Sequence, residues 1–301
     1  MDARLVLKGT GKQTTVIEIA PGVTVGDKQL LIVGGPCTVE SREQMEEVSR
    51  VLRGSVSALR GGVFKPRTSP YAFQGMREEG VKLLSEISRE SGIPVVTEVM
   101  SESHIEICDP VVDMLQIGSR NMQNFELLKA AGKAKKPVIL KRGLAATIEE
   151  FIMAAEYIMS EGNHNVILCE RGIRSFDSFT RNVLDLGAVV ALKQLTHLPV
   201  IVDPSHAAGK RELVPDLALA AIACGADGVM IECHPVPEES VSDARQALSL
   251  QDMVELVKRM QPIAEARGRS IGSSKPAPKE FSITSTLAAS MATREAKVSA
   301  A

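Results

Sequence analysis

Leu30-Leu31-Ile32-Val33 is the first of eight short, largely apolar runs in this sequence, and Gly228-Val229-Met230-Ile231 is the last. The runs alternate with longer stretches whose apolar residues follow the period of an amphipathic helix, as in repeated strand and helix units. Proline or glycine precedes several runs and is expected to end the previous helix. We predict strands near residues 30–34, 57–64, 94–98, 113–117, 137–141, 165–169, 199–203 and 227–232.

Two arrangements of eight such units are possible, a closed barrel and an open sheet. Near-continuous apolar strands are typical of a parallel sheet that is covered on both faces. Eight of them in about 240 residues fit a barrel better, and no G-x-G-x-x-G follows the first strand, as a dinucleotide-binding open sheet would require. We predict an α/β protein with a (β/α)8 TIM barrel over residues 29–267, with the open doubly wound sheet as the alternative.

The segments that flank the barrel differ from it in composition. Residues 14–19 alternate weakly and precede the turn-like Pro21-Gly22, so residues 1–28 are expected to form a short extension whose β-hairpin covers the N-terminal end of the barrel. Residues 268–301 are rich in Ser, Thr and Ala and bury too little apolar surface to offset their ordering entropy. We expect this tail to be disordered.

The overall composition excludes several classes of function. The 301 residues carry a net charge of −2, include no Trp and contain 3% aromatic residues, which disfavours nucleic acid or an anionic membrane as a partner. No stretch resembles a signal peptide, and no apolar run reaches the roughly 18 residues of a membrane span. The five cysteines are scattered without a C-x-x-C pair, so we expect a cytoplasmic protein without a disulfide framework.

Polar residues follow every predicted strand. In a (β/α)8 barrel the active site lies at the C-terminal ends of the strands, so these residues are expected to share one cavity. Any one of them is compatible with a solvated loop, but eight sets together indicate an active site. In strand order they are Cys37, Lys65 to Arg67, Glu98, Arg120, Lys141 and Arg142, Glu170 and Arg171, Asp203 to His206, and Glu232 with His234.

One group among these residues is cationic. Arg forks bind phosphate and carboxylate groups in a bidentate manner, and Lys acts as a mobile point charge, so the mixture suits a small phosphorylated acid. The candidate ligands of this anion are Arg60, Lys65, Arg67, Arg120, Lys141 and Arg171.

A second group has the donor types of a metal site. One thiolate, one imidazole and two carboxylates suit a divalent ion such as Mn, Fe, Co or Zn. The candidates are Cys37, His206, Glu232 and Asp243. Their spacing is not specific, and taken singly they also fit a buried thiol, a capping histidine and solvated acids. His104, His164, His197 and Cys108 lie in or beside predicted helices, so we interpret them as structural or exposed.

Several longer segments resemble the signatures of one enzyme family, the type I 3-deoxy-D-arabino-heptulosonate 7-phosphate (DAHP) synthases of the β subgroup. The resemblance runs from about residue 28 to 265, and the run Lys65-Pro66-Arg67-Thr68-Ser69 separates it from the related KDO 8-phosphate synthases. The segments are GPCTVES at 35–41, KPRTSPYAFQG at 65–75, QIGSRNMQN at 116–124, CERGIR at 169–174 and DPSH at 203–206.

The resemblance implies a reaction and a set of roles. Phosphoenolpyruvate would condense with erythrose 4-phosphate and water to give DAHP and phosphate, the first step of the shikimate pathway to aromatic amino acids. The implied metal ligands are Cys37, His206, Glu232 and Asp243. The implied ligands of phosphoenolpyruvate are Arg60, Lys65, Arg120, Lys141 and Arg171. Arg67, Thr68 and Ser69 would meet the phosphate of erythrose 4-phosphate.

Three further roles are hypotheses about catalysis. Lys65 is the candidate acid for the aldehyde oxygen, because a Lys among Arg residues gives up a proton more readily. Asp203 and Glu98 are candidates for orienting water or ligands. Departures from the family pattern, at Gly34, Ala72, Ser175 and Asp177, are expected to alter affinity without removing function.

Other readings of the sequence stay open. The rivals are KDO 8-phosphate synthesis, a catalytically silent barrel that serves a chorismate mutase in trans, and an aldolase that forms a Schiff base through Lys141. About thirty residues precede the barrel, which is too few for a regulatory domain with its own core. A homodimer or homotetramer is expected.

Overall fold

The computed structural model describes residues 2–9, 13–65, 71 and 73–272 as one barrel with its flanking segments. Eight parallel strands are hydrogen-bonded in chain order, and the last pairs with the first, from Gly228 beside Leu31 to Glu232 beside Gly35. This pairing closes the sheet, so the (β/α)8 prediction is confirmed and the open-sheet alternative is wrong. The strands are β3 (Gln29–Gly35), β4 (Ala58–Arg60), β5 (Val95–Val99), β6 (Met114–Ile117), β7 (Val138–Lys141), β8 (Val166–Glu170), β9 (Val200–Val202) and β10 (Gly228–His234).

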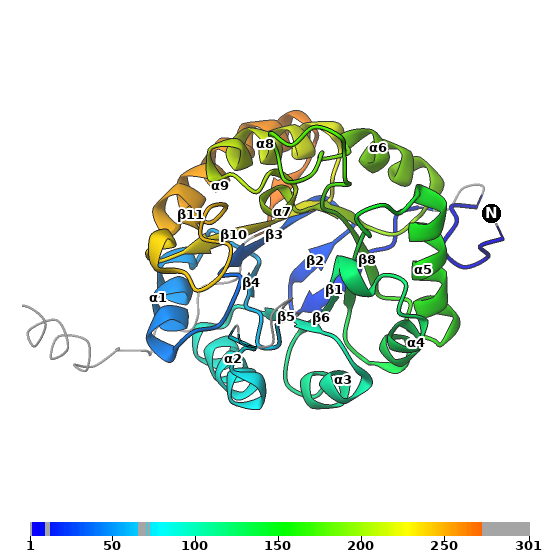
Figure 1. Ribbon diagram of the computed structural model, residues 1–301. Helices are drawn as coiled ribbons and strands as arrows, with labels where there is room; N and C mark the ends of the chain where they lie inside the picture. The colour runs from blue at the N-terminus through cyan, green and yellow to red at the C-terminus, as the bar shows by residue number, and fades with distance from the viewer. Residues whose placement is uncertain (1, 10–12, 66–70, 72, 273–301) are drawn as a thin grey trace, which may run out of the picture.

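Helices surround the barrel, as the ring of coiled ribbons in Figure 1 shows. Several begin with a side-chain cap, such as Thr147 and Glu150 at the start of α5, which form a capping box. The helices are α1 (Arg42–Leu52), α2 (Arg77–Ser91), α3 (Glu102–Cys108), α4 (Phe125–Lys133), α5 (Ile148–Ser160), α6 (Leu186–Leu195), α7 (Pro204–Ala208), α8 (Val214–Cys224) and α9 (Leu250–Ala266). Within the described part of the chain, none of them combines the length and apolar character that a membrane crossing requires.

The strands separate two layers of apolar packing. In β3, Leu30 and Ile32 pack against the helices, whereas Leu31 and Val33 point into the barrel. Because side chains alternate along a strand, one apolar run supplies both layers. The two layers explain why the sequence runs are apolar without a period of two.

An N-terminal hairpin closes one end of the barrel. Strand β1 (Ile17–Ala20) pairs antiparallel with β2 (Val23–Val25), and Figure 1 shows the pair within the ring of strands. Ile17 and Val25 are fully buried against residues that point into the barrel. The predicted hairpin is confirmed, and it leaves the opposite, C-terminal end of the barrel open for a site.

Two predicted boundaries differ from the structure. The run 57–64 was expected to be a strand, but β4 ends at Arg60 because a pair of glycines follows. A short strand, β12 (Ser270–Ile271), pairs with β3, so the described barrel extends beyond Arg267, where the tail was expected to begin. The expected disorder of the remaining tail concerns residues 273–301, which lie outside the described residues.

Candidate active site and metal centre

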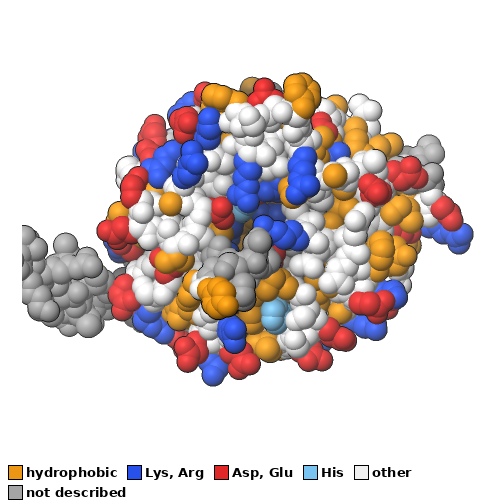
Figure 2. Space-filling view, viewed as in Figure 1, with side chains coloured by type: hydrophobic (Ala, Val, Ile, Leu, Met, Phe, Trp, Pro, Cys, Tyr) orange, Lys and Arg blue, Asp and Glu red, His pale blue; other side chains and the backbone are white. Residues whose placement is uncertain are grey.

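A cavity of about 530 Å³ opens at the C-terminal ends of the strands. Figure 2 shows Lys and Arg side chains gathered around this hollow. Its lining includes most of the candidates from the sequence, and the loops after β3, β4, β6, β7, β8, β9 and β10 contribute to it. The lining residues are Cys37, Arg60, Lys65, Glu98, Gln116, Gly118, Ser119, Arg120, Lys141, Leu144, Arg171, Arg174, Arg181, Asn182, His206 and Asp243.

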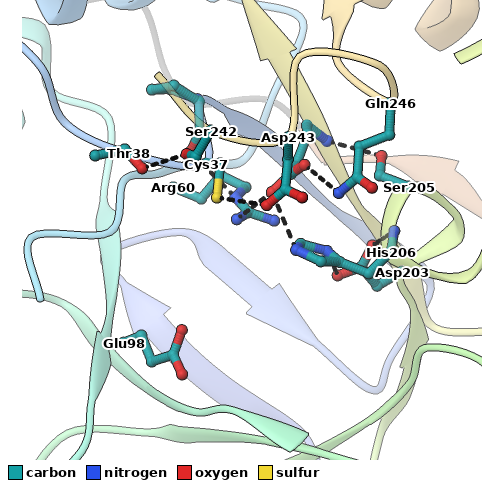
Figure 3. Close-up of polar contacts among 12 residues, drawn as sticks. Cys37, Thr38, Arg60, Glu98, Asp203, Ser205, His206, Ser242, Asp243 and Gln246 are labelled. Carbon is teal, nitrogen blue, oxygen red and sulfur yellow. Dashed lines mark hydrogen bonds and ion pairs between the residues drawn. The ribbon is translucent and has the colours of Figure 1, made fainter. Parts of the chain in front are cut away.

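The four metal-ligand candidates meet at one side of this cavity. Cys37, His206, Glu232 and Asp243 each offer one ligand atom, and these atoms lie within 4.8 Å of one another. Two of the contacts are direct: Sγ of Cys37 lies 3.2 Å from Oδ2 of Asp243, and Nε2 of His206 lies 3.1 Å from Oε1 of Glu232. Figure 3 shows Cys37, Asp243 and His206 turned toward a common centre.

Backbone geometry brings these ligands together. Gly35 has a φ of 140°, and a Cβ there would lie 2.4 Å from the carbonyl oxygen of Arg60, so the chain that leads to Cys37 passes close to β4. Asp243 is in the left-handed region with a φ of 56°, which costs about 1–3 kcal/mol for a residue other than glycine. Next to it, the buried hydroxyl of Ser242 is hydrogen-bonded to Thr38 at 2.5 Å, which ties the two ligand loops together.

Asp203 orients the imidazole. It caps α7 by accepting a hydrogen bond from the backbone N–H of His206 at 3.0 Å, and its Oδ2 lies 2.7 Å from Nδ1 of the same residue. Nε2 is therefore directed at Glu232, the arrangement expected of a metal-binding histidine held by a carboxylate. Burial opposes ionisation of Asp203, but His206 and Lys141 hold its pKa well below the usual range.

The pKa values of the thiol and of one carboxylate in the cluster are shifted in opposite directions. Burial raises the pKa of Cys37 to about 11, and the charge of Glu232 adds to this effect. For Asp243, burial is outweighed by His206 and by the hydrogen bond from Cys37, so its pKa is lowered. A divalent ion would displace the thiol proton, and the donor set of sulfur, nitrogen and two oxygens fits a borderline ion such as Mn, Fe, Co or Zn.

Lys65 lies beside the thiol. Its Nζ donates hydrogen bonds to the carbonyl oxygen of Cys37 at 2.7 Å and to its Sγ at 3.1 Å. A Cβ on Gly62 would lie 2.6 Å from this ammonium group, so the glycine makes room for it. The sequence placed Lys65 at the barrel mouth, and the structure brings it into contact with a metal-ligand candidate.

The predicted cations converge as expected within the described residues. Arg60 donates to Glu232 at 2.9 Å through Nη2, while its buried Nη1 has no partner among the described atoms. Lys141 pairs with Asp203 at 2.5 Å, and Arg171 donates to the carbonyl oxygen of His206 at 3.1 Å. Arg120 lines the same cavity. Arg67, Thr68 and Ser69 lie outside the described residues, so their predicted role stays a prediction.

Glu98 lies apart from the metal-ligand candidates, as Figure 3 shows, but lines the same cavity. It accepts a long hydrogen bond from Gln116 at 3.5 Å. A Cβ on Gly118 would lie 2.1 Å from Oε1 of Glu98, so the carboxylate packs directly on the glycine backbone.

Two residues that follow predicted strands serve the scaffold. Arg142 lies behind the cavity, where it pairs with Glu170 at 2.9 Å and with Asp185 at 3.0 Å. Glu170 also accepts from the backbone N–H of Gly172 at 2.6 Å, so this buried network joins the ends of β7 and β8. The adjacent residues Lys141 and Arg171 are thereby held in the cavity wall.

The histidines and the cysteine that were interpreted as structural or exposed lie away from the cavity lining. His197 is buried and contacts Thr15 and the carbonyl oxygen of Leu5, and His104 stacks on Phe64. Cys108 is buried and His164 is exposed.

Several site residues escaped the sequence reasoning. Arg174 and Arg181 add two cations to the cavity lining, and Gln246 contacts Glu232 from a buried position. Arg174 belongs to the CERGIR segment, so the family resemblance could have predicted it as a site residue. Arg181 and Gln246 lie in long loops, where no motif or periodicity indicates a role.

Comparisons with known proteins agree with this geometry. A family model described as the DAHP synthetase I family matches residues 13–267. Phospho-2-dehydro-3-deoxyheptonate aldolase of Thermotoga maritima is 47% identical over 266 residues, which are 88% of this chain and 78% of that protein. 2-Dehydro-3-deoxyphosphooctonate aldolase of Syntrophobacter fumaroxidans is 31% identical over 261 residues, 80% of this chain and 90% of the relative.

Two solved structures are similar in fold. The crystal structure of the Thermotoga maritima DAHP synthase has a TM-score of 0.86 at 44% identity and covers 90% of this chain and 79% of its own. A truncated form of 3-deoxy-D-arabino-heptulosonate 7-phosphate synthase from the same organism has a TM-score of 0.82 at 43% identity. The match covers 89% of this chain and 98% of the truncated form.

Proposed function

This chain belongs to the DAHP synthetase I family, and from that premise we propose how its barrel mouth carries out the family's reaction. The enzyme condenses phosphoenolpyruvate with erythrose 4-phosphate and water, and it releases DAHP and inorganic phosphate. The observation that carries the residue assignment is the meeting of four metal-ligand candidates and a set of buried cations on one cavity.

The metal-ligand assignment is the first part of the proposal. Cys37, His206, Glu232 and Asp243 would hold a divalent ion, and when bound it would supply Lewis-acid polarisation of the aldehyde of erythrose 4-phosphate. Support comes from the convergence of their ligand atoms and from the carboxylate of Asp203 behind His206. The donor types favour Mn, Fe, Co or Zn.

Phosphoenolpyruvate occupies the cationic side of the cavity. Arg120, Lys141 and Arg171 bind its phosphate, and Arg60 with Lys65 faces its carboxylate. The buried Nη1 of Arg60 supports this assignment, because an unpaired guanidinium N–H is costly to bury without an acceptor. Arg67, Thr68 and Ser69 are proposed to bind the phosphate of the aldehyde substrate. Two anions held together repel each other, and the cations offset that repulsion while they fix the reacting carbons.

Lys65 is proposed as the acid of the reaction. As the new carbon–carbon bond forms, its ammonium group gives a proton to the aldehyde oxygen, and its position beside Cys37 supports this role. Water then adds to C2 of the former phosphoenolpyruvate. Phosphate leaves by C–O cleavage and remains bound to the same Arg and Lys side chains until release.

Asp203 and Glu98 position other groups in this scheme. Asp203 contacts both Lys141 and His206, so its carboxylate fixes the substrate cation and the metal-binding imidazole together. Glu98 lies on the other side of the cavity and is proposed to orient water or substrate hydroxyl groups.

Alternative chemistry is less well supported. A Schiff base needs a neutral amine, but Nζ of Lys141 is buried in an ion pair with Asp203 at 2.5 Å. The phosphooctonate relative is 31% identical, against 47% for the heptonate relative, which favours erythrose 4-phosphate over arabinose 5-phosphate. A silent barrel that only serves a chorismate mutase has no use for the converging ligands and cations.

The cellular setting completes the proposal. A cytoplasmic location agrees with five unpaired cysteines in a reducing compartment. Apolar side chains are exposed in the β8–α6 loop, notably Phe176 and Phe179, and they support a protein partner at this surface. We propose that the partner is a second copy of the chain, in a homodimer or homotetramer, or a chorismate mutase in trans.

One experiment tests the assignment. Phosphate release from phosphoenolpyruvate is measured with erythrose 4-phosphate and with arabinose 5-phosphate, before chelation, after chelation and after metal add-back. We expect release with erythrose 4-phosphate that is lost in chelator and restored by metal. Preference for arabinose 5-phosphate, or full activity in chelator, would overturn the proposal.

A further inference from the structure

In each of the two carboxylates among the metal-ligand candidates, one oxygen faces the other ligands and the second oxygen is bound only from outside the cluster. Oε2 of Glu232 accepts a hydrogen bond from Nε2 of Gln246 at 2.5 Å. Oδ1 of Asp243 accepts one from Nη1 of Arg181 at 3.2 Å. The other oxygens face the cluster: Oε1 of Glu232 lies 3.1 Å from Nε2 of His206 and also accepts a hydrogen bond from Nη2 of Arg60 at 2.9 Å, and Oδ2 of Asp243 lies 3.2 Å from Sγ of Cys37.

The two outer donors are themselves joined. Nη1 of Arg181 also donates to Oε1 of Gln246 at 3.2 Å, so a continuous chain of hydrogen bonds runs from Glu232 through Gln246 and Arg181 to Asp243. Figure 3 shows the Gln246 side chain beside Asp243. Gln246 is 2% exposed, which places its bond to Glu232 in a low-dielectric interior.

The donors and acceptors in this chain of hydrogen bonds explain why an amide side chain is present at position 246. A carboxylate only accepts hydrogen bonds and a guanidinium only donates them, so the residue between them must donate on one side and accept on the other. Glutamine does both, whereas methionine of similar size has no donor and only a weak acceptor, and an ionised glutamate has no donor for Glu232. The backbone N–H of Gln246 also donates to the carbonyl oxygen of Asp243 at 3.0 Å, which ties this side chain to the strained ligand.

We propose that Gln246 and Arg181 restrict Glu232 and Asp243 to one ligand oxygen each, so that the bound ion keeps coordination capacity for substrate. A bidentate carboxylate would consume that capacity, and a catalytic metal site depends on it. The inference rests on the proposed metal ligands. Gln246 and Arg181 are positioning residues here, because they act through the ligands, and hydrogen bonds to metal ligands commonly alter affinity by about 10–100-fold.

The test uses Co²⁺, whose absorption reports both a thiolate ligand and the coordination number. In the wild-type chain, we expect Co²⁺ to give a thiolate-to-metal band and visible bands of a low-coordinate site. In Gln246→Met, Co²⁺ affinity is expected to fall about 10–100-fold, with weaker visible bands as Glu232 becomes bidentate. In Gln246→Glu, Co²⁺ affinity is expected to fall further, because the carboxylates of residues 246 and 232 then face each other. Gln251→Met, at an exposed position on α9, is the matched control.

Two added measurements keep a folding defect separate from a positioning effect. In Gln246→Met, the binding of phosphoenolpyruvate to the metal-free protein is expected to match the wild type, and unfolding is expected to stay cooperative with a midpoint lowered by only a few degrees, because one buried hydrogen bond is lost. Arg181→Met, which changes a partly exposed side chain, provides a second variant with the same direction of effect. Wild-type Co²⁺ affinity and spectra in both variants would overturn the inference, as would a loss of phosphoenolpyruvate binding in Gln246→Met equal to the loss of Co²⁺ binding. Failure of the wild-type chain itself to bind Co²⁺ would instead overturn the proposed metal ligands.

Discussion

Oδ2 of Asp203 lies 2.7 Å from Nδ1 of His206. The same oxygen atom lies 2.5 Å from Nζ of Lys141, so one buried carboxylate contacts a proposed metal ligand and a proposed substrate cation. A single side chain therefore links the proposed metal site to the proposed substrate site.

Replacement of this carboxylate tests its role in orienting His206. In Asp203→Asn the imidazole loses the charged partner that fixes its tautomer, so metal affinity is expected to fall about 10–100-fold. Binding of phosphoenolpyruvate to the metal-free protein is expected to fall less, because Lys141 keeps its positive charge. Metal titration and phosphoenolpyruvate titration measure the two effects. The exposed Asp216→Asn is the control, and an equal loss of both affinities would speak against the positioning role.

Removal of the thiolate tests the metal-dependent chemistry. Cys37→Ala takes away the sulfur ligand, so bound metal and activity are expected to disappear together, with activity at least about 1000-fold lower, or about 4 kcal/mol of lost transition-state stabilisation. Metal analysis, phosphate release and the unfolding midpoint are the measurements. Cys224→Ala, in α8 and outside the cavity lining, serves as the comparison and is expected to keep both properties. Retention of activity without metal in Cys37→Ala would exclude the assignment.

The raised pKa of Cys37 makes metal binding depend on pH. Because this pKa is about 11 in the metal-free protein, the thiol carries its proton at neutral pH and must lose it when a metal binds. Metal affinity is therefore expected to increase with pH, by up to about tenfold per unit between pH 7 and 9. Competition titrations at several pH values give the slope, and calorimetry in buffers of different ionisation enthalpy counts the released proton. A pH-independent affinity would show that Cys37 is already a thiolate.

Much of the fold was predictable because the barrel repeats one unit. Each run, such as the one at Leu30, is apolar on both faces, and eight copies in one chain leave few other architectures. The convergence of the cations on one cavity was predictable for the same reason, since the strand ends of a barrel meet at one mouth. Lys65 and Arg171 are examples.

Other parts depended on contacts that have no sequence pattern. The convergence of Cys37 and Asp243 joins residues 206 positions apart, and their residue types alone do not distinguish a metal site from a buried thiol and a solvated acid. Arg181 and Gln246 are ordinary loop residues in the sequence, and only their hydrogen bonds to Asp243 and Glu232 reveal a role. The predicted end of β4 is wrong because two glycines follow Arg60: a Cβ on Gly61 would lie 2.6 Å from Val39, and Gly62 makes room for Lys65.

Gly118 is another residue whose requirement appears only in three dimensions, and it yields a last prediction. An alanine Cβ at this position would lie 2.1 Å from Oε1 of Glu98, which is too close for any real contact, so the carboxylate or the loop after β6 must move. Gly118→Ala is expected to destabilise the protein by about 1–3 kcal/mol and to raise the KM for phosphoenolpyruvate more than it weakens metal binding, because the loop carries Arg120.

A double-mutant cycle identifies the cause of that effect. If the clash with Glu98 is responsible, Gly118→Ala costs much less stability in a Glu98→Ala background, where the carboxylate is gone. Gly9→Ala, at a position where a Cβ meets no atom within 4 Å, controls for the added methyl group. Denaturant unfolding of the four cycle members measures the coupling. An unchanged cost of Gly118→Ala in the Glu98→Ala background would mean that the backbone of the loop, and not the carboxylate, requires the glycine.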